Sequence, residues 1–397
     1  MFASVERFEI IPDITRIIEP NSSELSTNKR EGSLSMKEEA ERIGMPEHWR
    51  PPKIEGEWGN KSFISVEQLT ANDFAEIVNM ATRIRDTRMS KEQRALFELK
   101  SWLFPLSMQT AFYEPSTRTR TSFEAAAQIL GLDVVSNPDM IRMSSFSKGE
   151  TVADNAIVMG EISPVIVQRH PEVGAAAIAA FALQSMTRCD GTKPRVINAG
   201  DGIGEHPSQA LLDITTIIWE KRLKNANDLH RLHIGMLGDL KHGRTVHSLT
   251  KSLNCMGGPA VFYFISPEQL SMPQPIIESL TRGGQREVVV TDDLAEVLPS
   301  LDVLYVTRIQ NERFKDLDEC RRYENLYRIT PEIMKEAKKD LTLIHPLPRR
   351  GEIDPRVDSD PRAAYFRKPK PHYFHPDCLS KFYSVQPVFP ARFLWEY

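Results

Sequence analysis

The stretch at 116–122, Ser-Thr-Arg-Thr-Arg-Thr-Ser, constrains the fold of this chain more than any other feature. An apolar run at 108–112 precedes it and predicts a strand, and an alanine-rich run at 123–130, closing at Gly131, predicts a helix. Such a strand, tight turn and helix would gather free backbone N–H groups, the positive end of the helix dipole, hydroxyls and Arg118 at one point. A helix cap needs only one hydroxyl. We therefore predict a site for phosphate or another compact dianion.

Composition bounds the class of protein. The chain has 397 residues, of which 41% are hydrophobic and 26% charged, so it is long enough for two domains with cores of their own. The formal net charge of −4 does not favour nucleic acid as a partner, so any anion chemistry must come from local arginines. The four cysteines match no zinc or CxxC spacing, which indicates a reducing compartment.

The sequence gives no sign of membrane targeting. No apolar run reaches the length of a membrane span. The first residues include several acids and no apolar segment of the signal-peptide type, whereas organellar transit peptides are poor in acids. We expect a cytoplasmic protein with neither a membrane nor a nucleic acid as its partner.

From about residue 63 onward, strand-like apolar runs alternate with helical patterns. A first helix is expected after Thr70, whose side chain can form an N-cap with Asp73. Such alternation is typical of βαβ units, so we predict an α/β fold with two doubly wound domains, each a parallel sheet flanked by helices. The expected strands are 108–112, 165–168, 195–198, 232–237, 261–265, 288–290, 303–306 and 341–344, and further helices are expected at 123–130, 175–183, 209–219 and 245–253.

Polar clusters follow several of these strands. Taken singly, each has an ordinary explanation, because glycines make tight turns, a histidine is usually a satisfied polar residue and arginines usually lie in solvent. Their shared position at strand ends, where an α/β protein assembles its site, favours one cationic pocket for small, multiply anionic substrates. The residues concerned are Arg118, Arg169, His206, Gln209, Arg244 and Arg308.

The same clusters exclude several kinds of chemistry. None supplies a convincing nucleophile–base pair or a set of metal ligands. The glycines at 200–204 lack the G-x-G-x-x-G spacing of a dinucleotide site, and no G-x-x-x-x-G-K-[ST] stretch of a P-loop occurs. What remains is group transfer by positioning and electrostatic stabilisation, without a covalent intermediate.

These polar clusters, in the order in which they occur along the chain, resemble those of the aspartate carbamoyltransferases. This family joins carbamoyl phosphate to L-aspartate in pyrimidine biosynthesis. The resemblance spans about 63–367. It implies the aspartate/ornithine carbamoyltransferase fold, transferase activity, no cofactor, no metal, and a homotrimer with shared active sites. The chain is also similar to the aspartate carbamoyltransferase domain of eukaryotic pyrimidine multienzymes. This similarity implies carbamoyl-phosphate synthetase or dihydroorotase as further partners.

The resemblance also implies roles for individual residues. The catalytic set would be Arg118, Thr119, Arg169, His206 and Lys148, the last on a loop that the family inserts into the neighbouring subunit's site. Carbamoyl phosphate would contact Ser116, Thr117, Arg118, Thr119, Arg169, His206, Gln209, Ser144, Lys148 and Leu347. L-aspartate would contact Lys148, Arg244, Arg308, Gln310, Leu347 and Pro348.

Two alternatives stay open. Ornithine carbamoyltransferases share the Ser-Thr-Arg-Thr-Arg turn, but they usually carry Cys where this chain has Pro346, and a Ser-Met-Gly loop where it has 307–310. Arg308 suits a second carboxylate and would repel the ammonium of ornithine, so its charge also favours aspartate. The other alternative is a non-catalytic assembly protein with the same fold, and the intact set of site residues argues against it.

We expect four segments along the chain. They are a largely irregular N-terminal extension at 1–58, with an extended linker at 46–58, a carbamoyl-phosphate-binding domain at 59–205, an aspartate-binding domain at 206–357 and an atypical tail at 358–397. After Arg367 the family continues into an apolar helix that returns to the first domain, whereas this chain reads Lys-Pro-Lys-Pro-His-Tyr-Phe-His-Pro. Each interior proline costs a helix about 3 kcal/mol, so this tail cannot form that helix.

Overall fold

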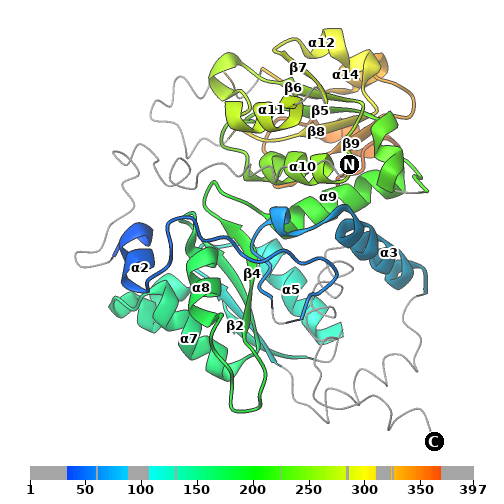
Figure 1. Ribbon diagram of the computed structural model, residues 1–397. Coiled ribbons are helices and arrows are strands. Elements are labelled where there is room, and N and C mark those ends of the chain that lie inside the picture. Colours follow the sequence, from blue (N-terminus) through cyan, green and yellow to red (C-terminus); the bar gives the residue numbers. More distant parts are fainter. Residues whose placement is uncertain are drawn as a thin grey trace, which may run out of the picture.

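Two parallel sheets, each flanked by helices, make up the protein (Figure 1). The first sheet has the strand order β2-β1-β3-β4 and the second the order β7-β6-β5-β8-β9. The predicted α/β class with two parallel-sheet domains is therefore confirmed. The computed structural model describes residues 34–59, 61–87, 107–129, 132–224, 226–282, 286–309, 323 and 326–367.

In the first sheet, β3 (Val165–His170) and β4 (Arg195–Asp201) are buried along their whole length, as expected where helices cover both faces. Val165 and Val167 of β3 belong to one hydrophobic cluster, and Ile166 between them belongs to another on the opposite face. The strands are β1 (Ser107–Phe112), β2 (Asp133–Asn137), β3 (Val165–His170) and β4 (Arg195–Asp201). The helices are α3 (Ala71–Thr87), α5 (Thr117–Ile129), α6 (Met140–Met143), α7 (Val152–Ile162), α8 (Ala175–Leu183) and α9 (Pro207–Glu220).

The second sheet follows the same plan, with β5 at its centre and continuous apolar runs in its inner strands. Its strands are β5 (His233–Leu237), β6 (Val261–Ile265), β7 (Glu287–Thr291), β8 (Val303–Val306) and β9 (Thr342–Ile344). Its helices are α10 (Arg244–Cys255), α11 (Gln274–Thr281), α12 (Leu294–Val297) and α14 (Pro331–Glu336).

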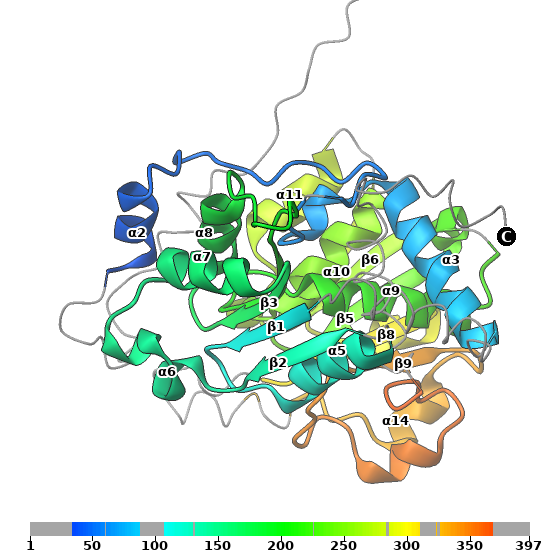
Figure 2. The ribbon, with the colours of Figure 1, turned by 90° about the horizontal axis from the view of Figure 1, so that it is seen from below.

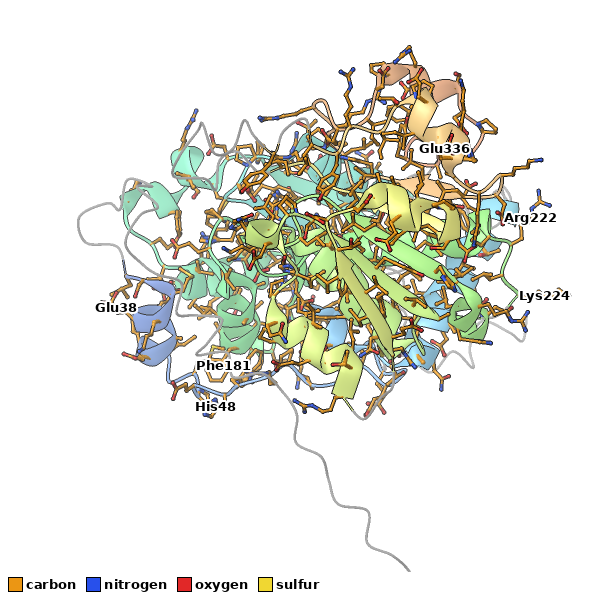
Figure 3. The ribbon with its side chains drawn as sticks, turned by 90° about the horizontal axis from the view of Figure 1, so that it is seen from above. Glu38, His48, Phe181, Arg222, Lys224 and Glu336 are labelled. Atoms are coloured by element: carbon orange, nitrogen blue, oxygen red, sulfur yellow. The ribbon has the colours of Figure 1, made fainter. Side chains whose placement is uncertain are left out.

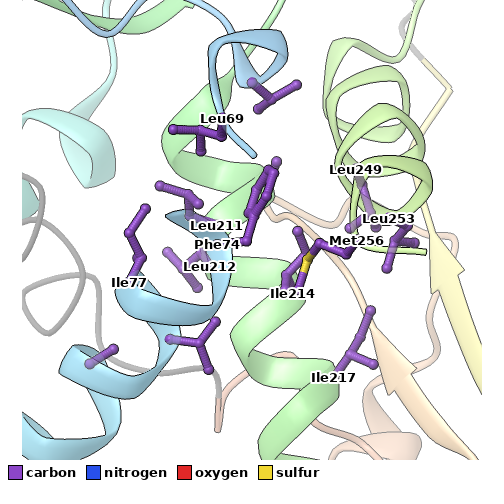
Figure 4. Packing of buried hydrophobic residues seen from close by; sticks show 14 of the residues in the cluster. Leu69, Phe74, Ile77, Leu211, Leu212, Ile214, Ile217, Leu249, Leu253 and Met256 are labelled. Atoms are coloured by element: carbon purple, nitrogen blue, oxygen red, sulfur yellow. The ribbon is translucent and has the colours of Figure 1, made fainter. Parts of the chain in front are cut away.

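Helix α9 connects the two domains through a shared hydrophobic core. One face of α9 packs against α3 of the first domain, and another packs against α10 of the second (Figure 4). One continuous cluster of buried residues therefore runs from the first sheet to the second. The side chains at this junction are Leu69, Phe74, Ile77, Leu211, Leu212, Ile214, Ile217, Leu249, Leu253 and Met256.

The predicted strands and helices are confirmed in type and order where the structure describes them. The predicted cap of α3 is also confirmed, because Thr70 and Asp73 exchange hydrogen bonds between side chain and backbone. Strand β2 and helices α6, α7, α11, α12 and α14 were missed. β2 lies at the edge of its sheet and is half exposed, so it lacks the apolar run that reveals an inner strand. Gly131 and the tail at 368–397 lie outside the described residues.

Folded structure begins before residue 63, where the alternating pattern of the sequence starts. Helix α2 (Met36–Arg42) lies within the predicted extension, and Ile54 and Trp58 further along are fully buried in the main core. The segment at 46–58 has no helix or strand, as expected of a linker, but it is packed against the first domain. Within the described parts of the chain, no helix is both long and apolar enough to span a lipid bilayer.

A lysine of α10 joins the second domain to two segments of the first. The Nζ atom of Lys251 lies 2.8 Å from Oε1 of Glu67 and 3.1 Å from Oε1 of Glu205. Glu67 belongs to the short helix η1 (Val66–Gln68), and Glu205 precedes α9. Glu205 also accepts hydrogen bonds from the Ser65 hydroxyl and the Val66 N–H. The lysine is only one quarter exposed, so these ion pairs are partly shielded from water.

We expect the substitution Lys251→Met to destabilise the protein, because Glu67 and Glu205 would keep their charges without a cation between them. The free energy of unfolding at neutral pH should fall by about 2 kcal/mol, less than for a fully buried pair because Glu67 is partly exposed. Burial alone would raise the pKa of Glu67, but Lys251 outweighs it and lowers that pKa. The stabilisation is therefore present at neutral pH and is lost as the pH falls through the lowered pKa.

Urea denaturation of wild type and variant at neutral pH and at about pH 3 measures this difference, which should shrink in acid. The matched control is Lys339→Met, which removes an exposed lysine and should change the free energy of unfolding by less than about 0.5 kcal/mol. A loss in Lys251→Met no larger than in this control would contradict the role of the ion pairs.

Candidate active site

The carboxyl ends of neighbouring strands bring the candidate residues together. Arg169 lies near the end of β3, Gly200 near the end of β4, and Glu114 just after β1, and these strands are adjacent in the first sheet. Arg244 is the first residue of α10, which follows β5 of the second sheet. The site therefore lies where the strand ends of both domains meet, as expected for an α/β fold.

One carboxylate pairs with arginines from both domains. Oε2 of Glu114 lies 2.9 Å from Nη2 of Arg169 and 3.4 Å from Nη2 of Arg244. The other terminal nitrogens donate to backbone carbonyls, with Arg169 Nη1 3.2 Å from the Ala199 oxygen and Arg244 Nη1 2.6 Å from the Gly202 oxygen. Both guanidinium groups are therefore held in place from two sides.

Gly200 allows these side chains to approach the backbone. Its φ is +114°, in a region that L side chains rarely adopt. A Cβ atom at this position would lie 3.0 Å from Arg169 Nη1, 3.3 Å from His206 Cδ2 and 3.4 Å from Arg244 Cζ. Arg169, His206 and Arg244 thus surround a single point of the chain. The predicted gathering of these three residues in one place is what the structure shows.

The cluster carries more positive charge than its own acid can neutralise. Arg169 is buried, with 8% of its surface exposed. Burial, followed by the charges of Arg244 and Arg118, lowers the pKa of Arg169 to about 10, although Glu114 acts in the opposite direction. Arg118 of the phosphate-type turn is thus close enough to repel Arg169. Three guanidinium groups against one carboxylate would be stabilised by an incoming anion.

The structure distinguishes the two arginines of the turn that opens α5. Arg120 is committed to Glu124, with Nη1 3.1 Å from each carboxylate oxygen, and it also donates to Ser136. Arg118 is exposed at the start of the helix, beside Thr117. Arg118 therefore remains the candidate anion ligand, whereas Arg120 fastens α5 to β2.

His206 is the N-cap residue of α9, and contacts from the second domain fix its position. Its backbone N–H donates to the hydroxyl of Ser248 in α10 at 3.1 Å, and its Nδ1 lies 3.3 Å from the hydroxyl of Ser208. Gln209, in the first turn of α9, donates to Oδ1 of Asp213 at 3.0 Å. Only 7% of the His206 surface is exposed, so its ring is held in a low-dielectric setting next to the arginines.

The loop after β9 is stabilised by a buried histidine. The Leu347 N–H donates to Nδ1 of His345 at 2.8 Å, while Nε2 of His345 lies 2.6 Å from Oε1 of Glu352. Burial acts to raise the pKa of Glu352, but hydrogen bonds from His345 and the Gly351 N–H lower it to about 2. These contacts support Leu347, whose φ of +61° is costly for a residue with a side chain.

Two family models cover both domains. The aspartate/ornithine carbamoyltransferase, carbamoyl-P binding domain matches residues 61–220, and the Asp/Orn binding domain of the same name matches residues 230–370. The chain belongs to the aspartate/ornithine carbamoyltransferase family. Its domains can now be called the carbamoyl-P domain and the Asp/Orn domain, and α9 lies at the end of the first match.

Relatives within this family are similar over most of the chain. The aspartate carbamoyltransferase catalytic subunit of Methanopyrus kandleri is 43% identical over 312 residues, which are 78% of this chain and 92% of that protein. Multifunctional protein pyr1-3 of Dictyostelium discoideum is 43% identical over 261 residues, 66% of this chain and 11% of that protein. The crystal structure of aspartate transcarbamoylase from Trypanosoma cruzi with carbamoyl phosphate and aspartate has a TM-score of 0.68 at 32% identity, covering 83% of this chain and 98% of that one.

The remaining candidate residues of this carbamoyltransferase-family chain stay predictions. Arg308 follows β8 as expected, and its Nη1 donates to the Ile309 carbonyl at 3.3 Å. Gln310 lies outside the described residues. Ser144 donates to the Met140 carbonyl, and Lys148 is exposed at the end of the same loop.

Glu114 was not predicted from the sequence, although it stands two residues before the hydroxyl-rich turn. An acid next to an arginine-rich segment is a weak signal, because most such acids are solvated. Only its contacts with arginines of two domains reveal what it does.

The substitution Gly200→Ala should displace all three groups around the glycine. At 3.0–3.4 Å from the new Cβ, the Arg169, His206 and Arg244 side chains would each have to move by a few tenths of an ångström. Because these are the groups proposed to bind the substrates, carbamoyl phosphate binding, measured by calorimetry, should weaken about tenfold or more. The matched control is Gly257→Ala, where φ is +94° but nothing lies within 4 Å of the position that a Cβ would take. It carries similar backbone strain and should leave binding unchanged. Equal binding by the two variants would contradict the role of Gly200.

Proposed function

We propose that the protein transfers the carbamoyl group from carbamoyl phosphate to the amino group of L-aspartate. The products are N-carbamoyl-L-aspartate and phosphate, and the reaction belongs to de novo pyrimidine biosynthesis. The observation that carries this proposal is the pairing of Arg169 and Arg244 with Glu114, together with Arg118 close enough for its charge to act on Arg169, because this excess of positive charge suits two anionic substrates. Relatives named aspartate carbamoyltransferase, and solved structures of such enzymes with both substrates, support the choice of reaction.

Carbamoyl phosphate would bind at the N-terminal end of α5. Free N–H groups at this end and the hydroxyls of Ser116, Thr117 and Thr119 offer donors to the phosphate, and the helix dipole adds favourable charge. Arg118 would form charge-assisted hydrogen bonds to the same phosphate. The N–H groups of a helix start need no reorganisation, so this part of the site is preformed.

The carbonyl oxygen of the carbamoyl group gains negative charge as the α-amino group of aspartate attacks the carbonyl carbon. Arg169, His206 and the Thr119 hydroxyl are proposed to stabilise this oxyanion. Removing one such donor typically costs about 10²–10³ in rate. The C–O bond to phosphate then breaks, and the departing phosphate takes up the proton that the amine loses. No covalent enzyme intermediate is needed, which agrees with the lack of a convincing nucleophile–base pair in the polar clusters of the sequence.

Arg244 and Arg308 are proposed to bind the two carboxylates of aspartate. They come from the second domain, whereas the carbamoyl phosphate ligands come from the first. Approach of the two domains would therefore bring the substrates together and exclude water. An ornithine acceptor would place its ammonium beside these cations, so aspartate is favoured over ornithine.

A homotrimer with shared active sites is part of this proposal. Helix α7 exposes apolar side chains that a neighbouring subunit could cover, with Ile157 41%, Val158 53% and Ile162 58% exposed. The loop with Ser144 and Lys148 ends where α7 begins, so the same surface would direct that loop toward a neighbour's site.

The proposal also includes a cytoplasmic location and association with carbamoyl-phosphate synthetase or dihydroorotase. Support for such an association comes from the multifunctional relative pyr1-3, of which this chain matches only a small part.

The assigned roles predict different kinetic effects for two arginines. Arg118→Ala should reduce turnover about 10²-fold or more, because it removes a ligand of the phosphate, which is the leaving group. Arg308→Ala should chiefly raise the KM for aspartate. The assay measures carbamoyl aspartate formed at varied concentrations of each substrate, with ornithine as the alternative acceptor. Arg282→Ala, an exposed position on α11's C-terminal side, serves as the control. Near-normal turnover in Arg118→Ala, or efficient use of ornithine, would refute the assignment.

Mixing two inactive variants tests whether sites are shared. In hybrids of Arg118→Ala and Lys148→Ala, some sites combine an intact Arg118 with an intact Lys148 from the neighbour. Random assembly around a three-fold axis should restore about a quarter of the wild-type sites. Hybrids of Arg118→Ala and Arg169→Ala should restore none, because both residues belong to the same protomer's part of the site. Recovery in neither mixture would contradict a shared site.

A further inference from the structure

Helix α2 lies outside both family matches and is packed against the first domain. It stands beside α7 and α8 in two perpendicular views (Figures 1 and 2). Figure 3 labels Glu38 on α2 and Phe181 on α8 at the same edge of the molecule. The ring of Trp49, which follows α2, packs edge-on against that of Phe181 with centroids 5.6 Å apart. The helix is thus fixed to the domain, although most of its side chains are polar.

A single buried acid of α2 reaches the start of α7. Glu39 is 2% exposed, and its Oε1 accepts a hydrogen bond from the Ala153 N–H at 2.6 Å. Ala153 is in the first turn of α7, where four N–H groups have no partner within the helix. Thr151, the N-cap residue, satisfies the N–H of Asp154. Glu39 therefore caps a second N–H of the same turn, and its charge favours that end of the helix dipole.

Arg42 holds the same turn from the other side. Its Nη2 donates to the Thr151 hydroxyl at 2.7 Å and lies 3.1 Å from Oδ1 of Asp154. Glu39 and Arg42 thus bind three groups at one helix start, namely the cap hydroxyl, a backbone N–H and a first-turn carboxylate. Glu41, on the same helix, is exposed to solvent.

The start of α7 is also the end of the loop that carries Ser144 and Lys148. The short helix η2 (Ser145–Lys148) is followed by Gly149, at φ +96°, and then directly by Glu150 and the N-cap of α7. Within the loop, the ring of Phe146 packs edge-on against Tyr113 with centroids 4.7 Å apart.

Two successive hydrogen bonds connect the C-terminal end of this loop, which we call its root, to the core. Glu150 accepts from the Asn155 amide at 2.8 Å, and Asn155 accepts from the Tyr113 hydroxyl at 2.8 Å. The root is therefore held from the core side by Tyr113 and from the outer side by α2. Lys148 lies only four residues before Val152, the first residue of α7. Greater mobility in the first turn of α7 would therefore also make Lys148 more mobile.

We propose that α2 acts as a clamp on the loop at 144–149, with Glu39 and Arg42 as positioning residues. They fix the N-terminal turn of α7 and thereby the direction in which Lys148 leaves the domain. This inference rests on the proposed function only for the loop's contact with carbamoyl phosphate. The clamp itself depends on contacts within one chain.

Hydrogen exchange measured by mass spectrometry on the full-length protein tests the clamp directly. In Glu39→Ala, peptides covering the loop and the first turn of α7 should exchange about fivefold faster or more, because a helix-cap contact is lost there. Glu39→Gln keeps an acceptor oxygen for the Ala153 N–H and should restore most of the protection. Glu41→Ala, on the exposed side of the same helix, is the matched control and should exchange like wild type.

Kinetics on the same variants give a readout that loss of stability alone would not produce. In Glu39→Ala the KM for carbamoyl phosphate should rise severalfold while kcat at saturation changes little, since Lys148 is displaced but not removed. Unchanged exchange in the loop of Glu39→Ala would overturn the clamp, and so would faster exchange spread evenly over the chain. If wild type forms no carbamoyl aspartate, the proposed function fails, whereas the exchange result still decides whether the clamp exists.

Discussion

The contact of Glu114 with Arg169 and Arg244 organises this site, because it joins a strand end of one domain to a helix start of the other. Like-charged guanidinium groups repel each other, and buried ones do so more strongly because water no longer screens them. One carboxylate lets two arginines face a common point, but it neutralises the charge of only one of them, and Arg118 adds a further positive charge to the cluster. This local excess of positive charge attracts anions, even though the net charge of the whole protein is −4.

The backbone provides the space in which this charge can gather. A parallel sheet ends all its strands at one edge, and the glycine at the end of β4 has no side chain to fill the room there. His206 is the N-cap residue of the helix that follows, and its N–H donates to the hydroxyl of Ser248 in the second domain. The same few contacts therefore position the reactive groups and set how the domains meet.

The sequence predicts much of the fold because inner strands of parallel sheets are continuous apolar runs. The run Val-Phe-Tyr-Phe-Ile at 261–265 is an example, and it forms β6 with every residue buried. Edge strand β2 has only two apolar residues in succession, and α2 is a short, mostly polar helix held by contacts of Glu39 and Arg42 with α7. Neither leaves a periodic signal, because each is stabilised by contacts with distant parts of the chain.

The candidate site was predictable to a similar extent. Positions after strand ends were enough to predict that Arg169, His206 and Arg244 come together, because α/β proteins assemble their sites at the carboxyl ends of their strands. The sequence could not show which of Arg118 and Arg120 binds the anion, since this depends on whether a nearby acid, Glu124, already binds one of them. The role of Arg308 rests on resemblance, and its contact with aspartate stays a prediction.

Helix α9 has a consequence for how the chain can be divided. Because it packs against α3 on one side and α10 on the other, its apolar surface belongs to both halves. If the chain were divided between the two family matches, Leu249, Leu253 and Met256 would lose their packing against α9. The separated C-terminal part would then expose these apolar side chains to solvent. Each half would then expose apolar surface and be prone to aggregate when expressed alone.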